Sequence, residues 1–599
     1  MTLTQKFSDF KSFLAHAWAL TRPYFASEHK WKARAWLAAI IALNLALVYM
    51  SVLFNDWNKL FYDALQNKNA SVFWAQLGRF TYLAFGFIVI AVYKFYLTQL
   101  LELRWRAWMT SHYLERWLSN QAFYKLELAR FASQPDAASG QSGKNPDNPD
   151  QRIQEDINQF TTDTISLSMG LLNAVVTLAS FVGILWGLSG GFAFTLAGSS
   201  FNIPGFMVWM AVLYSVAGSV LTHYIGRPLI KLNFVQQRLE ADFRHHMVRV
   251  REYSESIALD RGEPVERGQL ASRFGRVLGN SLALIKAQKN LIWFTSFFGQ
   301  AAVVFPFLVA APRFFSGAIQ LGELMQISSA FGQVQGALSW FVDSYSNLAG
   351  WRATTDRLTS FEASFQALSP ANKALVATDS EALNSSDLQL ALPDGTLLLD
   401  QAHLSAQAGD HILLQGPSGA GKSTLFRALA GIWPYATGHL QRPEGSMFIP
   451  QRPYFPNGPL RDALAYPQNP ALFGDDDLKN ALEQALLPGL TERLNEVGAW
   501  SQTLSGGEQQ RLAVARVLLK KPTWIFADEA TSALDETSEH LVYKTLLAHV
   551  DSVQGAIISI AHKPGMAAFH SRQWTLEKLP PGALARFTLR SNALPSQGT

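Results

Sequence analysis

The stretch that decides the fold of this chain is Gly416-Pro-Ser-Gly-Ala-Gly-Lys-Ser-Thr424, which follows the pattern G-x-x-x-x-G-K-S. An apolar run, His411–Leu414, precedes it, and a helical pattern, Ser423–Ala430, follows it. A phosphate-binding loop needs this strand–loop–helix order, because glycines let backbone N–H groups turn inward on a phosphate at a helix N-terminus. Lys422 would reach the β- and γ-phosphates, and the Ser423 hydroxyl would hold Mg²⁺. The residues predicted to bind nucleotide here are Gly416, Ser418, Gly419, Gly421, Lys422, Ser423 and Thr424.

Two carboxylates end an apolar run further along the chain, in the stretch Trp524-Ile-Phe-Ala-Asp-Glu529. Such a run predicts a buried strand. A carboxylate at the end of a strand beside a phosphate loop holds the Mg²⁺ shell, so we predict that role for Asp528. Glu529 is placed to act as the general base that polarises the attacking water.

Two other apolar runs end in polar side chains, Met447-Phe-Ile-Pro-Gln451 and Ile557-Ile-Ser-Ile-Ala-His562. We predict that Gln451 senses Mg²⁺ or the water, and that His562 contacts the γ-phosphate and orients the water. Ser505-Gly-Gly507 opens a predicted helix, so its hydroxyl and amides would form a second anion nest. The further residues counted as nucleotide-binding are Ser505, Gly506, Gly507 and Asp535, the last in Ser532-Ala-Leu-Asp535. Each feature alone is usually structural, but their occurrence together and in this order predicts a site that hydrolyses ATP.

The composition indicates a membrane protein. The 599 residues are 48% hydrophobic and only 16% charged, whereas soluble domains average about 25% charged residues. The net charge of +4 could attract nucleic acid, but the basic residues lie in loops between apolar spans, which is typical of the positive-inside pattern. The chain has no cysteine, so disulfides, thiolate metal sites and thiol nucleophiles are excluded.

Six apolar segments are candidate membrane spans, because each is about as long as a bilayer is thick. They are Ala35–Phe54, Phe80–Leu100, Leu167–Leu188, Pro204–Ile225, Leu291–Ala311 and, weakest by hydropathy, Leu324–Tyr345. The sixth carries glutamines and serines, which fits a helix that lines a wet cavity; the alternative is a soluble amphipathic helix. The basic residues between spans two and three and between spans four and five place these loops in the cytoplasm. Both loops show helical spacing, at Trp105–Leu128 and Val235–Ile257, and Gln134–Pro149 is a predicted flexible loop.

Residues 388–590 resemble the nucleotide-binding domain of an ATP-binding-cassette (ABC) transporter. The resemblance covers Walker A at the phosphate loop, the Q-loop glutamine Gln451, the signature from Leu504, Walker B with Asp528 and Glu529, the D-loop with Asp535 and the switch histidine His562. The signature reads LSGGE rather than LSGGQ, which spares the phosphate-facing serine and glycines. The family often has an aromatic residue before the first strand's turn that stacks on adenine. Here Leu390, Leu392 and Pro393 stand in that region, which puts adenine stacking in doubt.

The membrane half resembles the bacterial SbmA/BacA-like ABC transporters and, more loosely, the peroxisomal subfamily D transporters. The matching stretches include Arg104-Trp-Arg-Ala-Trp108, Asn148-Pro-Asp-Gln-Arg-Ile153 and Glu240-Ala-Asp-Phe-Arg244. The resemblance implies an α-helical six-span transmembrane domain of the exporter type (type IV), fused to an α/β P-loop NTPase domain. We expect an N-terminal interfacial segment at 1–34, the transmembrane domain at 35–361, a linker at 362–387 and the ATPase domain at 388–599.

One chain carries one phosphate loop and one signature. In the family, each nucleotide lies between the phosphate loop of one domain and the signature of another, so Lys422 and Ser505 would meet only across a two-fold axis. The resemblance therefore implies a homodimer with two identical sites, although a heterodimer with another half-transporter stays open.

The expected function is ATP-driven transport across the bacterial inner membrane, with ATP and Mg²⁺ as cofactors and the ATPase domain in the cytoplasm. The expected partners are a second copy of the chain, the lipid bilayer and the transported small molecule or peptide, and no nucleic acid. The solute would be hydrophilic or amphipathic, of the peptide or cobalamin kind, and transport would run inward in an exporter-type fold. The alternatives are a lipid or fatty acyl-CoA transporter of the subfamily D type, and a membrane regulator that binds ATP without transport.

Overall fold

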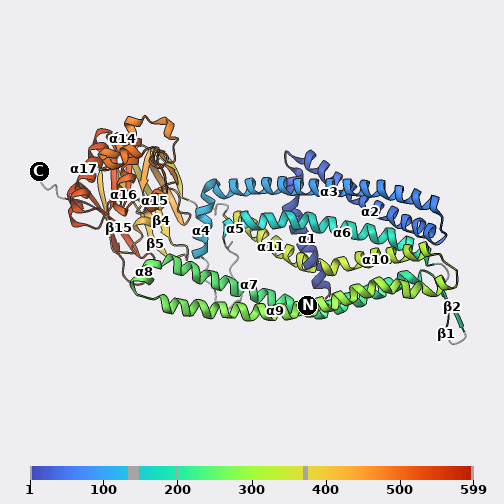
Figure 1. Ribbon diagram of the computed structural model, residues 1–599. Coiled ribbons are helices and arrows are strands. Elements are labelled where there is room, and N and C mark those ends of the chain that lie inside the picture. Colours follow the sequence, from blue (N-terminus) through green and yellow to red (C-terminus); the bar gives the residue numbers. More distant parts are fainter. Residues whose placement is uncertain (1–2, 133–147, 190–191, 197–198, 369–374, 595–599) are drawn as a thin grey trace. The chain divides into compact units, whose positions relative to one another are not determined.

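The computed structural model describes residues 3–132, 148–189, 192–196, 199–368 and 375–594 (Figure 1). The chain forms two compact units. The helical unit comprises Met1–Leu114 and Asn148–Thr359, and the sheet unit comprises Glu115–Asp147 and Ser360–Thr599. The loop expected at Gln134–Pro149 lies almost wholly outside the described residues.

Long helices make up the helical unit (Figure 1). They are α1 (Leu3–Ala26), α2 (Lys30–Gln66), α3 (Ala70–Leu118), α6 (Ile157–Leu188), α7 (Phe206–Glu252), α9 (Glu263–Phe315), α10 (Leu321–Asp343) and α11 (Tyr345–Ala367). Shorter elements are α5 (Pro149–Gln151), the π-helical turn η2 (Arg152–Asp156), α8 (Ser254–Leu259) and the hairpin of β1 (Phe192–Leu196) with β2 (Ser199–Ile203). Helices α3 and α11 each begin in the helical unit and end in the sheet unit.

Five of the described helical segments are long and apolar enough to cross a membrane: Lys30–Gln66, Ala70–Ala129, Pro149–Leu188, Phe206–Glu252 and Glu263–Phe315. They contain the first five expected spans. The sixth expected span lies in α10, which is helical but is not among these five, so the count of six spans stays a prediction. The predicted helical extensions are confirmed in part. Helix α3 ends at Leu118, and the stretch predicted to Leu128 continues through the turn Ser119–Gln121 into a separate helix, Ala122–Ala132. Helix α7 ends at Glu252, and the stretch predicted to Ile257 continues into α8.

Helix α10 shows why its hydropathy is low. Ile327, Phe331 and Val334 on one of its faces are buried in an apolar cluster that also holds Phe181 of α6. On the opposite face Gln333 is exposed, together with Gly332 and Gly336. Apolar residues that recur every three to four positions bury one stripe of a helix and leave the other face polar. The helix therefore packs into the bundle on one side and presents an amide to open space on the other.

The described part of the sheet unit contains two large sheets and a short antiparallel pair, β10 (Gly458–Pro459) with β11 (Val497–Gly498). The six-stranded sheet has the order β15-β14-β7-β13-β12-β9, in which β15 alone pairs antiparallel. Its strands are β7 (His411–Gln415), β9 (Ser446–Ile449), β12 (Trp524–Asp528), β13 (Ala556–Ile560), β14 (Arg572–Lys578) and β15 (Phe587–Ala593). The second sheet has the order β3-β8-β4-β5, with β3 (Val376–Ser380), β4 (Leu383–Ala391), β5 (Leu397–Ala402) and β8 (Ala436–Pro443), and β6 (Ser405–Ala406) pairs with β4.

Helices cover the sheets and close two apolar cores. The described α-helices of the sheet unit are α4 (Ala122–Ala132), α12 (Lys422–Leu429), α13 (Leu460–Ala465), α14 (Asp475–Gln484), α15 (Trp500–Thr503), α16 (Gly506–Lys520) and α17 (Glu536–Ser552), together with the ends of α3 and α11. Helix α4 belongs to the sheet unit because Leu128 packs against the core that contains Leu414 and Phe426.

The segment 362–387 was expected to be a linker, and the structure corrects this. It holds the end of α11, strand β3 and the start of β4. The small and polar residues of this segment suggested a linker, but residues 376–380 form an edge strand of the second sheet, where β3 pairs with β8. Four of the five β3 side chains are exposed, and the outward face of an edge strand needs no apolar residues.

His570, eight residues after the predicted switch histidine, lies in the core of the sheet unit and should make stability depend on pH. Burial lowers its pKa to about 4, the His411 charge adds to this, and the hydrogen bond between Nδ1 and the Met566 carbonyl opposes it. Since the unfolded side chain titrates near 6.5, the unfolded state binds more protons between these values. Stability should thus fall by about 3 kcal/mol as the pH drops from 6.5 to 4.

The test is the thermal unfolding midpoint measured across this pH range. His570→Gln should remove most of the slope, whereas His403→Gln, which changes an exposed histidine, should leave it unchanged. An unaltered slope in His570→Gln would show that other groups set the acid sensitivity.

Candidate nucleotide site

The phosphate loop connects β7 to α12, as the sequence predicts. Gly419 and Gly421 have φ angles of +76° and +88°, a region that other residues rarely adopt. Gly421 is the N-cap of α12, so the first N–H groups of this helix point toward the loop. Lys422 Nζ donates to the carbonyl oxygens of Gly416 and Pro417, at 2.9 and 3.1 Å. The ammonium group is therefore held over the cradle that the loop forms.

Asp528 and Ser423 lie together beside this loop. The Ser423 hydroxyl hydrogen-bonds to the Asp528 carboxylate. Burial raises the pKa of the Asp528 carboxyl, the Ser423 hydrogen bond lowers it, and the Glu529 charge raises it further. A hydroxyl and a carboxylate are oxygen ligands that suit Mg²⁺, which takes most of its other ligands from water and substrate phosphates. Among the described residues, no three His, Cys, Asp or Glu side chains form a group that could hold a metal ion.

Three predicted catalytic side chains meet at one point. Gln451 Nε2 donates to Glu529 Oε2 at 2.7 Å, and His562 Nε2 lies 3.0 Å from Glu529 Oε1. Strand register explains this meeting. Leu414, Ile560, Asp528 and Ile449 lie at nearly the same level of four adjacent parallel strands, so the residues that follow them emerge at one edge. Glu529 leaves this edge with φ +49°, and its N–H donates to the Ile560 carbonyl at 3.0 Å.

The signature segment begins helix α16. Ser505 is the N-cap, and its hydroxyl accepts from the Glu508 N–H at 3.4 Å. The Glu508 carboxylate in turn accepts from the Ser505 N–H at 2.9 Å and from its hydroxyl at 2.7 Å. This capping box uses the residue that replaces glutamine in the signature, and these hydrogen bonds lower the pKa of Glu508. A negative charge therefore occupies the helix N-terminus that was predicted to face a phosphate.

Among the described residues, no hydrogen bond or ion pair joins Ser505, Gly506, Gly507 or Asp535 to the phosphate loop. Asp535 is the N-cap of α17 and accepts from the Ser538 N–H at 2.9 Å. These hydrogen bonds lower the pKa of Asp535. Within one chain, Asp535 therefore serves as the N-cap of α17.

Gln510 is a residue that the sequence argument missed. It lies on α16 with 5% of its surface exposed. Its amide nitrogen donates to the Glu529 carbonyl at 3.3 Å and to the Ser532 hydroxyl at 3.0 Å, and its oxygen accepts from the Ala533 N–H at 2.9 Å. Gln510 thus connects the signature helix to the segment that follows the two carboxylates. Its neighbour Gln509 is also a glutamine directly after the signature, so the sequence does not distinguish the two residues. Only the burial of Gln510 does.

The position expected to stack on adenine is occupied by aliphatic side chains. Leu390 is fully buried in the core, and Leu392 packs against this core. Neither side chain has an aromatic ring that could stack on adenine. Two aromatic side chains adjoin this strand: Trp433 Nε1 donates to the Ala391 carbonyl at 2.8 Å, and the Tyr435 carbonyl accepts from the Ala391 N–H at 3.0 Å.

Comparisons with known proteins agree with this geometry. The family described as ABC transporter transmembrane region 2 matches residues 20–315, and the family described as ABC transporter matches residues 399–532. The chain is 33% identical to the inner membrane ABC transporter ATP-binding protein YddA of Escherichia coli over 93% of this chain and 96% of that protein. It is 34% identical to the ABC transporter D family member 2, chloroplastic, of Arabidopsis thaliana over 95% of this chain and 86% of that protein.

A solved structure of similar fold is that of a bacterial Atm1-family ABC exporter with ATP bound. The TM-score is 0.67 at 18% identity, and the match covers 91% of this chain and 93% of the exporter chain. This likeness confirms the exporter-type fold. The narrower resemblance to SbmA/BacA-like transporters stays a prediction.

Proposed function

The chain belongs to the ABC transporter family and couples ATP hydrolysis to transport across a membrane, and on this premise we propose that it moves a hydrophilic or amphipathic solute, of the peptide or cobalamin kind, across the bacterial inner membrane. The proposed direction is inward.

The observation that supports turnover rather than mere binding is the contact of Gln451 and His562 with Glu529. Glu529 accepts the proton of the water that attacks the γ-phosphorus, and His562 and Gln451 hold that carboxylate in place. Lys422 binds the phosphate oxygens. Ser423 and Asp528 would hold Mg²⁺, which would shield the charge of the phosphates. A regulator that only binds ATP would need none of this arrangement around Glu529.

The second copy of the chain completes each site in this proposal. In the part of the chain that the structure describes, no hydrogen bond or ion pair joins Ser505–Gly507 to the phosphate loop of the same chain, and the α16 N-terminus at Gly506 leaves N–H groups for a phosphate. A C2 dimer would bring the signature of one chain to the phosphate loop of the other, with two equivalent sites. Ser505 would then exchange its hydrogen bond with Glu508 for one with the γ-phosphate.

Because the chain has no cysteine, this dimer can be tested by cross-linking. Ser418 and Ser505 are both exposed. We expect the variant with Ser418→Cys and Ser505→Cys to give a covalent dimer with a bifunctional maleimide about as long as a nucleotide. The measurement is the mass of the denatured product. Each single substitution is the control and should stay monomeric, and a double variant that cross-links only within one chain would refute the shared site.

The polar face of α10 supports a hydrophilic solute. Gln333 is exposed there between Gly332 and Gly336, while the apolar face of the same helix is buried. Polar residues inside membrane helices usually face a water-filled cavity. We expect Gln333→Leu to slow uptake of the solute and to leave the rate of ATP hydrolysis unchanged.

A cavity on α9 favours the alternative, a lipid or acyl-CoA carrier. It has a volume of about 500 Å³ and is lined by Ile285, Gln288, Lys289, Ile292, Trp293 and Ser296. An apolar wall with a single ammonium group suits an acyl chain with an anionic head. Proteoliposomes with ATP on one defined side distinguish the two: uptake of peptide or cobalamin supports the first proposal, and movement of acyl-CoA alone, lost in Lys289→Gln, supports the second.

A further inference from the structure

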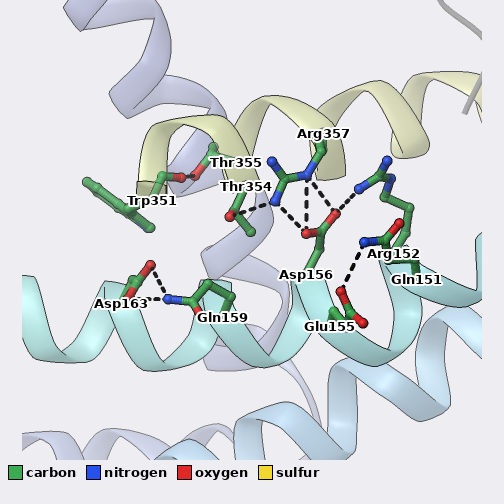
Figure 2. Close-up of polar contacts among 10 residues, drawn as sticks. All are labelled: Gln151, Arg152, Glu155, Asp156, Gln159, Asp163, Trp351, Thr354, Thr355 and Arg357. Carbon is green, nitrogen blue, oxygen red and sulfur yellow. Dashed lines mark hydrogen bonds and ion pairs between the residues drawn. The ribbon is translucent and has the colours of Figure 1, made fainter. Parts of the chain in front are cut away.

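The carboxylate of Asp156 is held between two arginines where α6 begins (Figure 2). Arg357 of α11 approaches it with Nε at 3.2 Å from Oδ1 and 3.0 Å from Oδ2, and with Nη2 at 2.6 Å from Oδ1. Arg152 donates to Oδ2 from one turn earlier. Only 5% of the Asp156 side chain is exposed, against 13% for Arg152 and 41% for Arg357. We call this group the Asp156 clamp.

Side-chain contacts join the α6 segment to α11 at two places, and the clamp lies at one end of this stretch. At the other end, Trp351 Nε1 donates to the Thr164 hydroxyl at 2.8 Å. Between them in α11, Thr354 and Thr355 are buried, with 2% and 0% of their surfaces exposed. Thr354 also accepts from Arg357 at 3.0 Å and fixes the guanidinium (Figure 2). The π-helical turn η2, which contains Asp156, is a rare geometry that is frequent at functional sites.

Helix α11 is also the segment that leads out of the helical unit. It continues without interruption from Tyr345 to Ala367 and passes into the sheet unit after Thr359. Within the sheet unit, Glu362 of α11 accepts from Arg116 at the end of α3, at 2.6 Å, and the same arginine lies 5.0 Å from the Phe365 ring. One helix thus carries an arginine–carboxylate contact on each side of the boundary between the units.

Stability alone does not explain a buried carboxylate between two arginines. Desolvation of such groups offsets most of their attraction, and well-packed apolar residues often stabilise a fold as much. A bidentate guanidinium–carboxylate pair differs from apolar packing because it fixes the angle and register of the elements that it joins. The Asp156 clamp therefore suits a junction that must transmit movement without slipping.

We propose that Asp156 and Arg357 are positioning residues for coupling: they lock α6 to α11, so that a movement of the ATPase part that reaches α11 is passed to a membrane-crossing helix. This inference rests on the proposed function, because it presumes that ATP drives a movement. Without the clamp the ATPase part still binds ATP and closes, but the membrane helices no longer follow.

Spin labels on the full-length dimer in lipid nanodiscs test the proposal. The chain has no native cysteine, so one substitution places one label on each copy. Lys544→Cys reports on the ATPase part, and Ser316→Cys reports on the loop after α9; both positions are exposed. All measurements use a Glu529→Gln background, which holds ATP. Each label is combined with Asp156→Asn, with Arg357→Lys and with the control Asp56→Asn, which breaks the Arg79–Asp56 pair elsewhere in the bundle.

In the parent and in Asp56→Asn, we expect ATP to shift the label-to-label distance at both positions. In Asp156→Asn, the shift at the Lys544→Cys label and the ATP concentration that produces it should be unchanged, while the shift at the Ser316→Cys label falls by about fivefold. Arg357→Lys keeps the positive charge but loses the planar guanidinium that binds both carboxylate oxygens, so it should give an intermediate shift at the Ser316→Cys label.

The proposal is overturned if Asp156→Asn and Arg357→Lys show the parent's shift at both labels. It is also overturned if both variants lose ATP binding or the shift at the Lys544→Cys label, because the clamp would then only maintain the fold. A parent that shows no ATP-dependent shift at either label would instead refute the proposed function, and the two failures are thereby distinguished.

Discussion

Replacement of Glu529 by glutamine should lower ATP turnover by about 10²–10⁴-fold and leave ATP binding intact. Glutamine keeps the size of the side chain and can still contact Gln451 and His562, which lie 2.7 and 3.0 Å from the carboxylate oxygens. An amide does not accept a proton from water, so only the hydrolytic step is lost. The measurement is phosphate release by the purified protein, with binding of a fluorescent ATP analogue measured in parallel.

The matched control is Glu536→Gln, which makes the same change at an exposed position of α17. It should hydrolyse ATP at the parent's rate. If the parent binds ATP but turns over no faster than Glu529→Gln, the protein is a regulator that binds nucleotide, and the transport proposal fails. If Glu529→Gln also loses binding, the side chain has a structural role in the loop that follows β12.

Replacement of Lys422 by alanine should weaken ATP binding by about 10²-fold. The ammonium group donates to the Gly416 and Pro417 carbonyls, which places it over the phosphate loop. A charge-assisted hydrogen bond contributes about 1.5–3 kcal/mol, and the loss of one such bond corresponds to roughly 10–150-fold in affinity. Titration of the purified protein with a fluorescent ATP analogue measures this change.

Lys544→Ala, at an exposed position of α17, is the control and should bind ATP as the parent does. An affinity of Lys422→Ala within a factor of about two of the parent would place the phosphates elsewhere. Together with Glu529→Gln this variant separates binding from hydrolysis, because one substitution removes the first step and the other removes the second.

The nucleotide site could be predicted because its chemistry is encoded in short continuous stretches. The glycines of the phosphate loop, Lys422 and the first turn of α12 are neighbours in the chain, and so are the strand β12, Asp528 and Glu529. Local backbone geometry decides where these residues point. Gln451 and His562 could be added because apolar runs that end in a polar residue, in a parallel sheet, bring those residues to one edge.

Other features of the site depend on which side chains fold against each other. Gln510 and Gln509 carry the same sequence signal, and only packing shows that Gln510 binds the Glu529 carbonyl. The capping box between Ser505 and Glu508 is a local pattern that could have been read from the sequence, but the resemblance drew attention to the phosphate instead. The linker expected at 362–387 was wrong in large part because polar edge strands resemble loops in composition.

The sequence by itself determined the phosphate loop, the two carboxylates of β12 and the first five membrane segments, because each depends on residues that are adjacent in the chain or on a repeating apolar pattern. The exporter-type architecture was implied by the family resemblance and is confirmed by the likeness to a solved exporter. Only the tertiary structure decided that α4 packs on the sheet unit and that Arg357 binds Asp156, from which it is separated by 201 residues in the chain. The physical reason is that a pair of distant charges leaves no periodic signal: whether they meet depends on how whole helices pack, and that is settled by the buried surfaces between them rather than by the charges themselves.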